Sequence, residues 1–274
     1  MADRTYPAVI RTAKGLLRLI KTDIRVMGAE HIPSKGGALL AINHLSYLDF
    51  VLAGYAALPT KRLVRFMAKK EIFDHAVAGP LMRSMHHIPV NRRDGVGSYH
   101  AAVDSLRSGE LVGIFPEATI SRSFEIKDIK TGAVRIAQAA EVPLIPMIVW
   151  GSHRIITKDH PRDFSRGKSI HISVGAPMPV HEGDAVPQTA ALRARMQELL
   201  AQTIDGYPAD EQPRDPGGSR LHAVDLRPHP NERLNSIAKN LLVERPSDAS
   251  NAHWLPEERL EWVRFTRMLC ALPG

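Results

Sequence analysis

Residues 38–50 read Ala-Leu-Leu-Ala-Ile-Asn-His-Leu-Ser-Tyr-Leu-Asp-Phe, and this stretch decides the fold that we expect. Five apolar residues run into a polar Asn-His pair and then into a turn. That pattern predicts a buried strand that delivers His44 to its carboxyl end, with a helix starting just after it. An Asp49 carboxylate in the first turn of that helix can reach back to the imidazole, fix its tautomer and orient the other ring nitrogen. Because this five-residue spacing arises easily by chance, the pair needs partners elsewhere in the chain.

Similar short apolar runs recur outward from this stretch and alternate with helical patterns. Apolar strands separated by helices predict an α/β fold with a mainly parallel central sheet and helices on both faces. In such sheets a ligand binds beyond the carboxyl ends of the strands, where His44, Arg92 and Glu117 each fall. We expect strands at 37–43, 63–68, 87–92, 111–116, 143–150 and 169–175, and helices at 48–57, 72–85, 95–108, 129–140 and 187–204.

Residues 1–25 are predicted to form an amphipathic helix. At about 100° per residue one arc is apolar and a separate arc is basic. A helix of this kind is typical of an anionic membrane surface, but an amphipathic helix packed on the domain with a solvated basic face explains the pattern equally well. The apolar arc holds Val9, Ile10, Ala13, Leu16, Leu17, Ile20 and Ile24, and the basic arc holds Arg11, Lys14, Arg18, Lys21 and Arg25.

Two further units follow, a folded domain at 26–205 and an extension at 206–274. The segment 207–218 is rich in Pro, Gly and charge and reads as a linker, and short helical patterns follow near 231–243 and 255–271. The extension holds the single cysteine, Cys270, which leaves no internal disulfide. Since no run of 18 apolar residues occurs, we expect no membrane-spanning helix.

The whole chain has 274 residues and a net charge of +7, which indicates an anionic partner such as nucleic acid, a phosphorylated substrate or anionic lipid. Aromatic residues make up only 5%, which leaves few platforms for stacking bases. No helix-turn-helix, zinc-finger or RNP-type motif is present, so we expect no nucleic-acid partner. There is no HExxH motif, and the adjacent His86 and His87 would face opposite sides of a strand and could not both bind one ion, so we expect no metal site either. A site built from His44, Asp49 and another histidine is the disfavoured alternative.

Four blocks of the chain stand out: Asn43-His44-Leu45-Ser46-Tyr47-Leu48-Asp49, Ile88-Pro89-Val90-Asn91-Arg92, Ile114-Phe115-Pro116-Glu117-Ala118-Thr119-Ile120-Ser121 and Val142-Pro143-Leu144-Ile145-Pro146-Met147. They resemble the blocks of the glycerolipid acyltransferase family, which includes the 1-acylglycerol-3-phosphate acyltransferases. They occur in the family's order and the resemblance spans roughly residues 25 to 205. A serine-hydrolase alternative is disfavoured, because there is no GxSxG elbow and Ser46 beside His44 is a weak candidate nucleophile.

The resemblance implies transfer of an acyl chain from a thioester, on CoA or acyl carrier protein, to a glycerol hydroxyl, with no cofactor. His44 backed by Asp49 would act as the general base on that hydroxyl. Arg92, and Lys69 in a minor matching block, would hold the acceptor's phosphate. Glu117 would bind acceptor hydroxyls. The expected partners are acyl-CoA, lysophosphatidic acid and an anionic membrane surface, and the expected location is the cytoplasmic face of the cell membrane, as a peripheral or monotopic protein.

The third block departs from the family pattern FPEGTRS at two positions. Ala118 replaces a glycine and Ile120 replaces an arginine, which removes a candidate phosphate contact. Arg122 is a candidate substitute, and backbone N–H groups from Thr119 to Ser121 could form an anion-binding nest. The acceptor therefore stays open among lysophosphatidic acid, glycerol-3-phosphate, another lysophospholipid and a glycolipid. A non-catalytic basic protein that binds lipid or nucleic acid is the alternative from another class.

Overall fold

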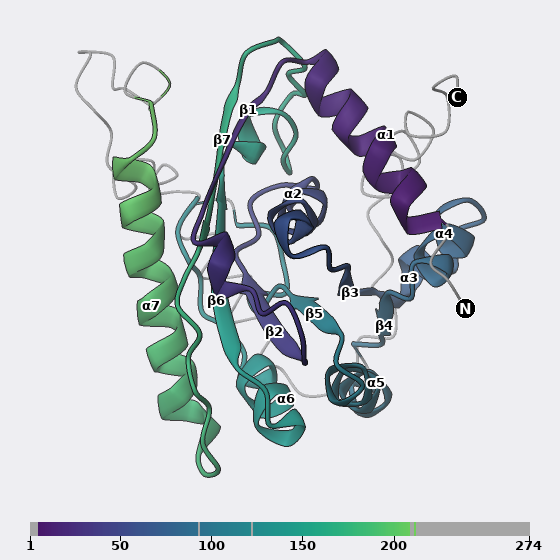
Figure 1. The fold of residues 1–274 in the computed structure, drawn as a ribbon, viewed down its shortest axis with the longest axis vertical. Helices are drawn as coiled ribbons and strands as arrows, with labels where there is room; N and C mark the ends of the chain where they lie inside the picture. The colour runs from purple at the N-terminus through teal and green to yellow at the C-terminus, as the bar shows by residue number, and fades with distance from the viewer. Residues whose placement is uncertain (1–4, 93, 122, 209–210, 212–274) are drawn as a thin grey trace.

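A single mixed sheet organises the computed structural model, which describes residues 5–92, 94–121, 123–208 and 211. Its strands lie in the order β1-β7-β6-β2-β5-β3-β4 (Figure 1). The strands are β1 (Asp23–Met27), β2 (Ala38–Ile42), β3 (Val64–Lys69), β4 (Ile88–Val90), β5 (Leu111–Ile114), β6 (Leu144–Trp150) and β7 (Ser169–Val174).

The strand β2 lies at the centre of this sheet and is fully buried. It runs parallel to both neighbours, and Leu40 stands in register with Gly113 of β5 and Ile145 of β6. The strands β3 and β4 continue the parallel arrangement beyond β5. Only β7 turns antiparallel to β6, and β1 pairs parallel to β7 at the edge. The predicted mainly parallel sheet with helices on both faces is confirmed.

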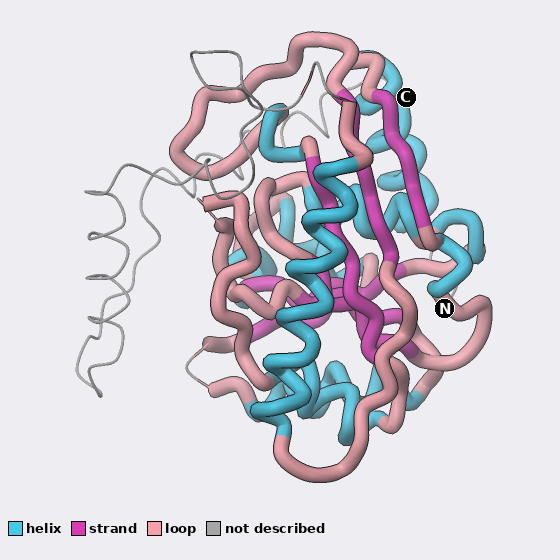
Figure 2. The backbone as a smooth tube through the Cα atoms, turned by 90° about the vertical axis from the view of Figure 1, so that its left-hand side faces the viewer, coloured by secondary structure: helices cyan, strands magenta, loops and turns pink. Residues whose placement is uncertain are grey.

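Helices cover both faces, as expected for apolar strands without polar alternation. Figure 1 places α1 and α7 on opposite sides of the sheet, and the tube view in Figure 2 shows α7, in front, lying along the strands. The α-helices are α1 (Thr5–Leu19), α2 (Asp49–Ala56), α3 (Lys70–Phe73), α4 (Ala78–Ser84), α5 (Val96–Arg107), α6 (Gly132–Ala140) and α7 (Ala185–Asp205), and short 3₁₀ turns lie at η1 (Ala29–His31), η2 (Leu58–Thr60) and η3 (Ser152–Arg154).

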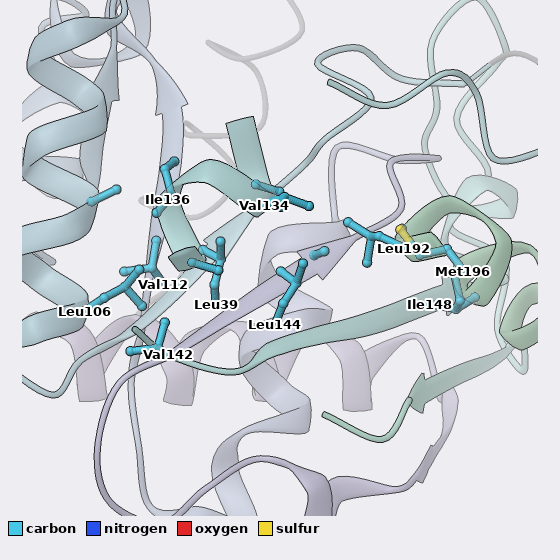
Figure 3. Close-up of a cluster of buried hydrophobic side chains, with 14 of the residues drawn as sticks. Leu39, Leu106, Val112, Val134, Ile136, Val142, Leu144, Ile148, Leu192 and Met196 are labelled. Carbon is cyan, nitrogen blue, oxygen red and sulfur yellow. The ribbon is translucent and has the colours of Figure 1, made fainter. Parts of the chain in front are cut away.

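Two hydrophobic cores result from the strict alternation of side chains along each strand. In β2, Leu39 and Ala41 point towards α5, α6 and α7, whereas Leu40 and Ile42 point towards α2. Figure 3 shows the first core, with Leu39 of β2 close to side chains from the helices. Each fully buried leucine contributes about 1.5–3 kcal/mol relative to an exposed one, so the two-sided burial of β2 fixes the position of the residues that follow it.

The N-terminal segment differs from the predicted helix over residues 1–25. The helix α1 ends at Leu19, and residues 23–27 form the edge strand β1 with alternating exposed and half-buried side chains. Ile24 matched the apolar arc of a helix, but period-two burial against β7 prevails once the strand can pair. The apolar side of α1 packs on the domain through Ala13 and Leu17, and Tyr6 donates a hydrogen bond from its hydroxyl to Val64 O at 2.8 Å.

Two other differences are smaller. The predicted helix at 72–85 is divided into α3 and α4, which are separated by a turn. The predicted helices at 231–243 and 255–271 and Cys270 lie outside the described residues, as does nearly all of the predicted linker. None of the helices in the described part of the chain is long and apolar enough to cross a membrane.

Candidate active site

The candidate site residues follow four neighbouring parallel strands. His44 comes after β2, Glu117 after β5, Lys69 ends β3 and Arg92 comes after β4. Because β2, β5, β3 and β4 are adjacent and parallel, these four residues form a row along the carboxyl ends of the strands. Ligands of parallel α/β sheets bind at the carboxyl ends of the strands. His44, Arg92 and Glu117 therefore lie at strand ends as predicted, and the structure adds Lys69 to this row of four residues.

Asn43 fixes the end of β2 just before His44. Its side chain donates to Val149 O at 3.1 Å and accepts the Val149 N–H at 2.7 Å, so the amide continues the ladder between β2 and β6. The residue is fully buried, where an amide with unmade hydrogen bonds would be costly. We predicted no role for Asn43, because the signal that identifies it is its pairing with a strand more than 100 residues away.

His44 and Asp49 form the contact predicted from their spacing. His44 Nδ1 lies 3.1 Å from Asp49 Oδ2, and Asp49 stands in the first turn of α2. The same oxygen accepts the backbone N–H groups of Leu45 at 2.6 Å and Ser46 at 2.7 Å. Asp49 is fully buried, and these hydrogen bonds hold its Oδ2 oxygen beside the His44 ring. A carboxylate at Nδ1 selects the tautomer in which Nε2 of the neutral ring can accept a proton.

An aromatic ring packs against one face of the imidazole. Phe115 stacks on His44 with ring centroids 4.3 Å apart and an interplanar angle of 29°. The His44 side chain stays 22% exposed, and Nε2 makes no hydrogen bond within the described residues. The ring is therefore held at one nitrogen and on one face, and its second nitrogen is available to a ligand.

Ser46 is engaged in a structural role. Its hydroxyl donates to Ile156 O at 2.5 Å and accepts the Leu48 N–H at 3.0 Å. Nearby, Thr157 donates from Oγ1 to Leu45 O at 2.5 Å, which joins the same two loops. The Ser46 hydroxyl is therefore engaged in two hydrogen bonds within the scaffold, which argues against Ser46 as a nucleophile and against the serine-hydrolase alternative.

Glu117 supports the loop that carries His44. Its Oε1 accepts the His44 N–H at 3.1 Å, and its Oε2 accepts the Lys127 N–H at 3.2 Å. The residue is only 5% exposed, and burial raises its pKa to about 7, against the opposing effect of the two backbone hydrogen bonds and the Lys127 charge. These two hydrogen bonds give Glu117 a structural role in the loop. The binding of acceptor hydroxyls by Glu117 stays a prediction.

The loop after Glu117 differs from the predicted anion nest. The Ser121 N–H donates to His44 O at 2.7 Å, and the Ser121 hydroxyl donates to Glu125 O at 2.9 Å. Since Ser121 is also almost fully buried, its polar groups are committed to holding the loop. Thr119 is exposed, Ala118 adopts a left-handed φ of 58°, and Arg122 lies outside the described residues. The conformation that a glycine would adopt easily is thus retained with alanine in its place.

Arg92 and Lys69, the two residues predicted to bind phosphate, lie at the ends of β4 and β3, on the side of the row away from His44. Arg92 is exposed and donates from Nη2 to Ala118 O, which brings its guanidinium to the loop that contacts His44. Lys69 stands in register with Val90 and is half-buried at the start of α3. In the described part of the chain no group of three or more His, Cys, Asp or Glu side chains is arranged to hold a metal ion.

An apolar pocket lies between α1 and α2, lined by Tyr6, Val9, Phe50, Val51 and Gly54 among others. Aromatic rings lead towards it from the site. Phe115 is stacked 6.4 Å from Phe66, and Phe66 meets Phe50 edge-on at 6.0 Å. A continuous series of aromatic ring contacts therefore leads from His44 to the pocket.

Comparison with known proteins agrees with this architecture. A profile of the family described as "Acyltransferase" matches residues 23–150. A 1-acyl-sn-glycerol-3-phosphate acyltransferase of Bacillus subtilis is 32% identical over 183 residues, which cover 66% of this chain and 89% of that protein. The chain belongs to the glycerolipid acyltransferase family.

Other relatives are consistent with that membership. A chloroplastic 1-acyl-sn-glycerol-3-phosphate acyltransferase of Brassica napus is 31% identical over 140 residues, covering 50% of this acyltransferase and 39% of the plant protein. The crystal structure of a 1-acyl-sn-glycerophosphate acyltransferase from Thermotoga maritima superimposes with a TM-score of 0.62 at 19% identity, over 74% of this chain and 80% of that one. That structure shares the fold of this acyltransferase.

Proposed function

We propose that this acyltransferase moves a fatty acyl chain from acyl-CoA to the free hydroxyl of lysophosphatidic acid, with His44 as the general base. The observation that carries the proposal is the geometry of His44, whose Nδ1 is held 3.1 Å from buried Asp49 while Nε2 is open to a ligand. The names of the Bacillus and Brassica relatives favour this acceptor and a role in phospholipid synthesis.

The chemistry follows from the weak nucleophilicity of an alcohol near neutral pH. His44 Nε2 takes the proton of the acceptor hydroxyl as its oxygen attacks the thioester carbonyl. When the tetrahedral intermediate collapses, the new ester C–O bond is retained and the C–S bond breaks. The imidazolium returns its proton to the departing thiolate, which leaves as the CoA thiol. Asp49 stabilises the transient charge on the ring.

The acceptor's phosphate would bind at the Arg92 end of the row. A guanidinium offers two parallel N–H donors to phosphate oxygens, and the Lys69 ammonium adds a second positive charge. This arrangement would place the phosphate beyond β3 and β4 and the reacting hydroxyl beside His44 after β2.

We assign the pocket between α1 and α2 to the acyl chain. It is apolar, and Phe115, Phe66 and Phe50 connect it with the imidazole. Burial of each methylene contributes about 0.8 kcal/mol, so the part of an acyl chain that enters this pocket would bind there in preference to water.

The basic side of α1 would hold the enzyme on an anionic membrane surface, where acceptor and product reside. Arg11, Arg18 and Lys21 are exposed, while Ala13 and Leu17 are buried in the domain. Basic residues near such a surface each contribute about 1 kcal/mol of attraction.

Glycerol-3-phosphate, another lysophospholipid or a glycolipid are the alternative acceptors, because Ile120 stands where the family has an arginine.

An acceptor screen with a matched pair of variants tests the proposal. Purified enzyme with acyl-CoA should acylate a lysophosphatidic acid isomer in preference to glycerol-3-phosphate. His44→Gln should lower the rate by about 10²–10⁴-fold, whereas His100→Gln, at an exposed position of α5, should not. Retained turnover in folded His44→Gln would refute the general base, and preference for another acceptor would refute the substrate.

A further inference from the structure

A hydroxyl from a distant turn completes the hydrogen bonding of Asp49. Ser152 Oγ donates to Asp49 Oδ1 at 2.7 Å, and both residues are fully buried. The other carboxylate oxygen, Oδ2, already serves His44 and the two backbone N–H groups of Leu45 and Ser46. Ser152 is thus the only side chain in the described residues that holds Oδ1. It lies outside the four blocks of the family resemblance.

The chain path between β6 and η3 directs Ser152 towards Asp49. Gly151 has a φ of 93°, and a Cβ at this position would lie 2.3 Å from Ser169 O. Only glycine fits this close approach in a left-handed conformation. The turn therefore leaves the sheet at one defined angle, and Ser152 is the first residue after it.

The far end of the same turn is anchored on residues that follow α7. Arg154 donates to the Tyr207 hydroxyl at 3.0 Å and forms an ion pair with Glu211. Glu211 in turn accepts the Ser169 N–H at 3.0 Å and the Ser169 hydroxyl at 2.6 Å. With Gly151 fixed on one side and Arg154 on the other, the position of the Ser152 hydroxyl is set by the scaffold.

We propose that Ser152 is a positioning residue of the reaction, acting through Asp49 on His44. The hydrogen bonds at Oδ2 fix one carboxylate oxygen, but the plane of the carboxylate can still tilt about that oxygen, which would change the angle of its contact with His44 Nδ1. The hydrogen bond at Oδ1 fixes the second oxygen, limits this tilt and keeps the imidazole oriented. The role rests on the proposed general base, but the orientation of the ring can be measured without turnover.

The kinetic test compares three substitutions. Ser152→Ala should lower kcat by about 10- to 100-fold, the range for loss of a hydrogen bond to a charged group, with KM for acyl-CoA and lysophosphatidic acid changed less than about twofold. Ser152→Thr, which keeps the donor, should stay within about threefold of wild type. Ser173→Ala removes another buried serine hydroxyl, one that contacts Thr203, and should leave kcat unchanged.

A coupled variant separates positioning from general structural damage. In an Asp49→Asn background, Ser152→Ala should change kcat by less than about twofold, because the carboxylate through which it acts is gone. If Ser152→Ala does not fold, Ser152→Cys supplies a weaker donor of similar size and should give an intermediate kcat. Equal losses in both backgrounds, or a loss confined to KM, would overturn the proposal.

A spectroscopic readout distinguishes this proposal from the proposed function. The downfield proton resonance of His44 Nδ1–H, identified by its absence in His44→Gln, should shift or broaden in Ser152→Ala and persist in Ser152→Thr and Ser173→Ala. An unchanged resonance in Ser152→Ala would overturn the positioning role. Absence of acyl transfer by the wild-type enzyme with a normal resonance would instead refute the proposed function alone.

Discussion

The backbone N–H of His44 donates to the Oε1 of Glu117 at 3.1 Å, so the base and a buried carboxylate from the next strand are joined directly. Glu117 also binds Lys127 N through its second oxygen, which ties the loop after β5 to the loop after β2. The residue that the family pattern offers as a substrate ligand thus also builds the loop around the base.

The first prediction concerns pH and Glu117. Burial raises its folded-state pKa to about 7 from 4.5, so the folded protein binds this proton more tightly than the unfolded chain. The resulting stabilisation is complete below about pH 4.5 and is lost as pH rises through about 7. The loss amounts to about 3 kcal/mol at about 1.36 kcal/mol per pKa unit. Urea unfolding between about pH 4 and pH 8 should show this decline for wild type and not for Glu117→Gln; parallel curves would contradict it.

The second prediction concerns Arg92 and the acceptor's phosphate. Arg92→Ala should lower kcat/KM for lysophosphatidic acid by about 10- to 100-fold, because a charge-assisted contact to phosphate is lost. Steady-state kinetics should show little change in KM for acyl-CoA. Arg107→Ala is the control, since Arg107 is also exposed and also donates to a backbone carbonyl, but at the end of α5. A selective loss of acyl-CoA affinity in Arg92→Ala would show that the residue binds the donor.

The third prediction concerns the pocket between α1 and α2. A Cβ on Gly54 would meet its nearest neighbour, Phe66, at 3.8 Å, so alanine fits there and a larger side chain would extend into the pocket. Gly54→Leu should therefore shift the preferred acyl-CoA to a shorter chain, and Gly54→Ala should leave the preference close to that of wild type. Rates measured over a series of acyl-CoA lengths check this. An unchanged length profile in a folded Gly54→Leu enzyme would place the acyl chain elsewhere.

The fourth prediction concerns membrane attachment. Deletion of residues 1–25 would remove Tyr6, Ala13 and Leu17 from the core and most of β1 from the sheet, so point substitutions are the cleaner test. Arg11→Gln with Arg18→Gln should weaken sedimentation with anionic vesicles by about 30-fold, at about 1 kcal/mol for each residue. Arg107→Gln with Arg195→Gln makes the same charge change on α5 and α7, on the other face of the sheet, and should have little effect. Equal effects of the two pairs would indicate attraction by net charge alone.

The N-terminal segment shows where sequence patterns mislead. The arc from Val9 to Ile24 is consistent with one helix at about 100° per residue, yet the chain leaves the helix at Leu19 and enters β1. Ile24 and Val26 also satisfy the period of a strand, and pairing with β7 decides between the two. Helix periodicity is a local property, whereas strand pairing depends on a partner about 145 residues away, which no local pattern can reveal.

By itself the sequence determined the alternation of strands and helices and the placement of His44, Arg92 and Glu117 at strand ends. These features follow from the order of apolar and polar residues along short stretches of chain. Only the tertiary structure decided which groups meet: Ser152 with Asp49 across 103 residues, and Glu117 with His44 across 73. The physical reason is that strand order in the sheet brings these loops together, and a hydrogen bond between them depends on positions that are set to within tenths of an ångström by packing of the whole domain.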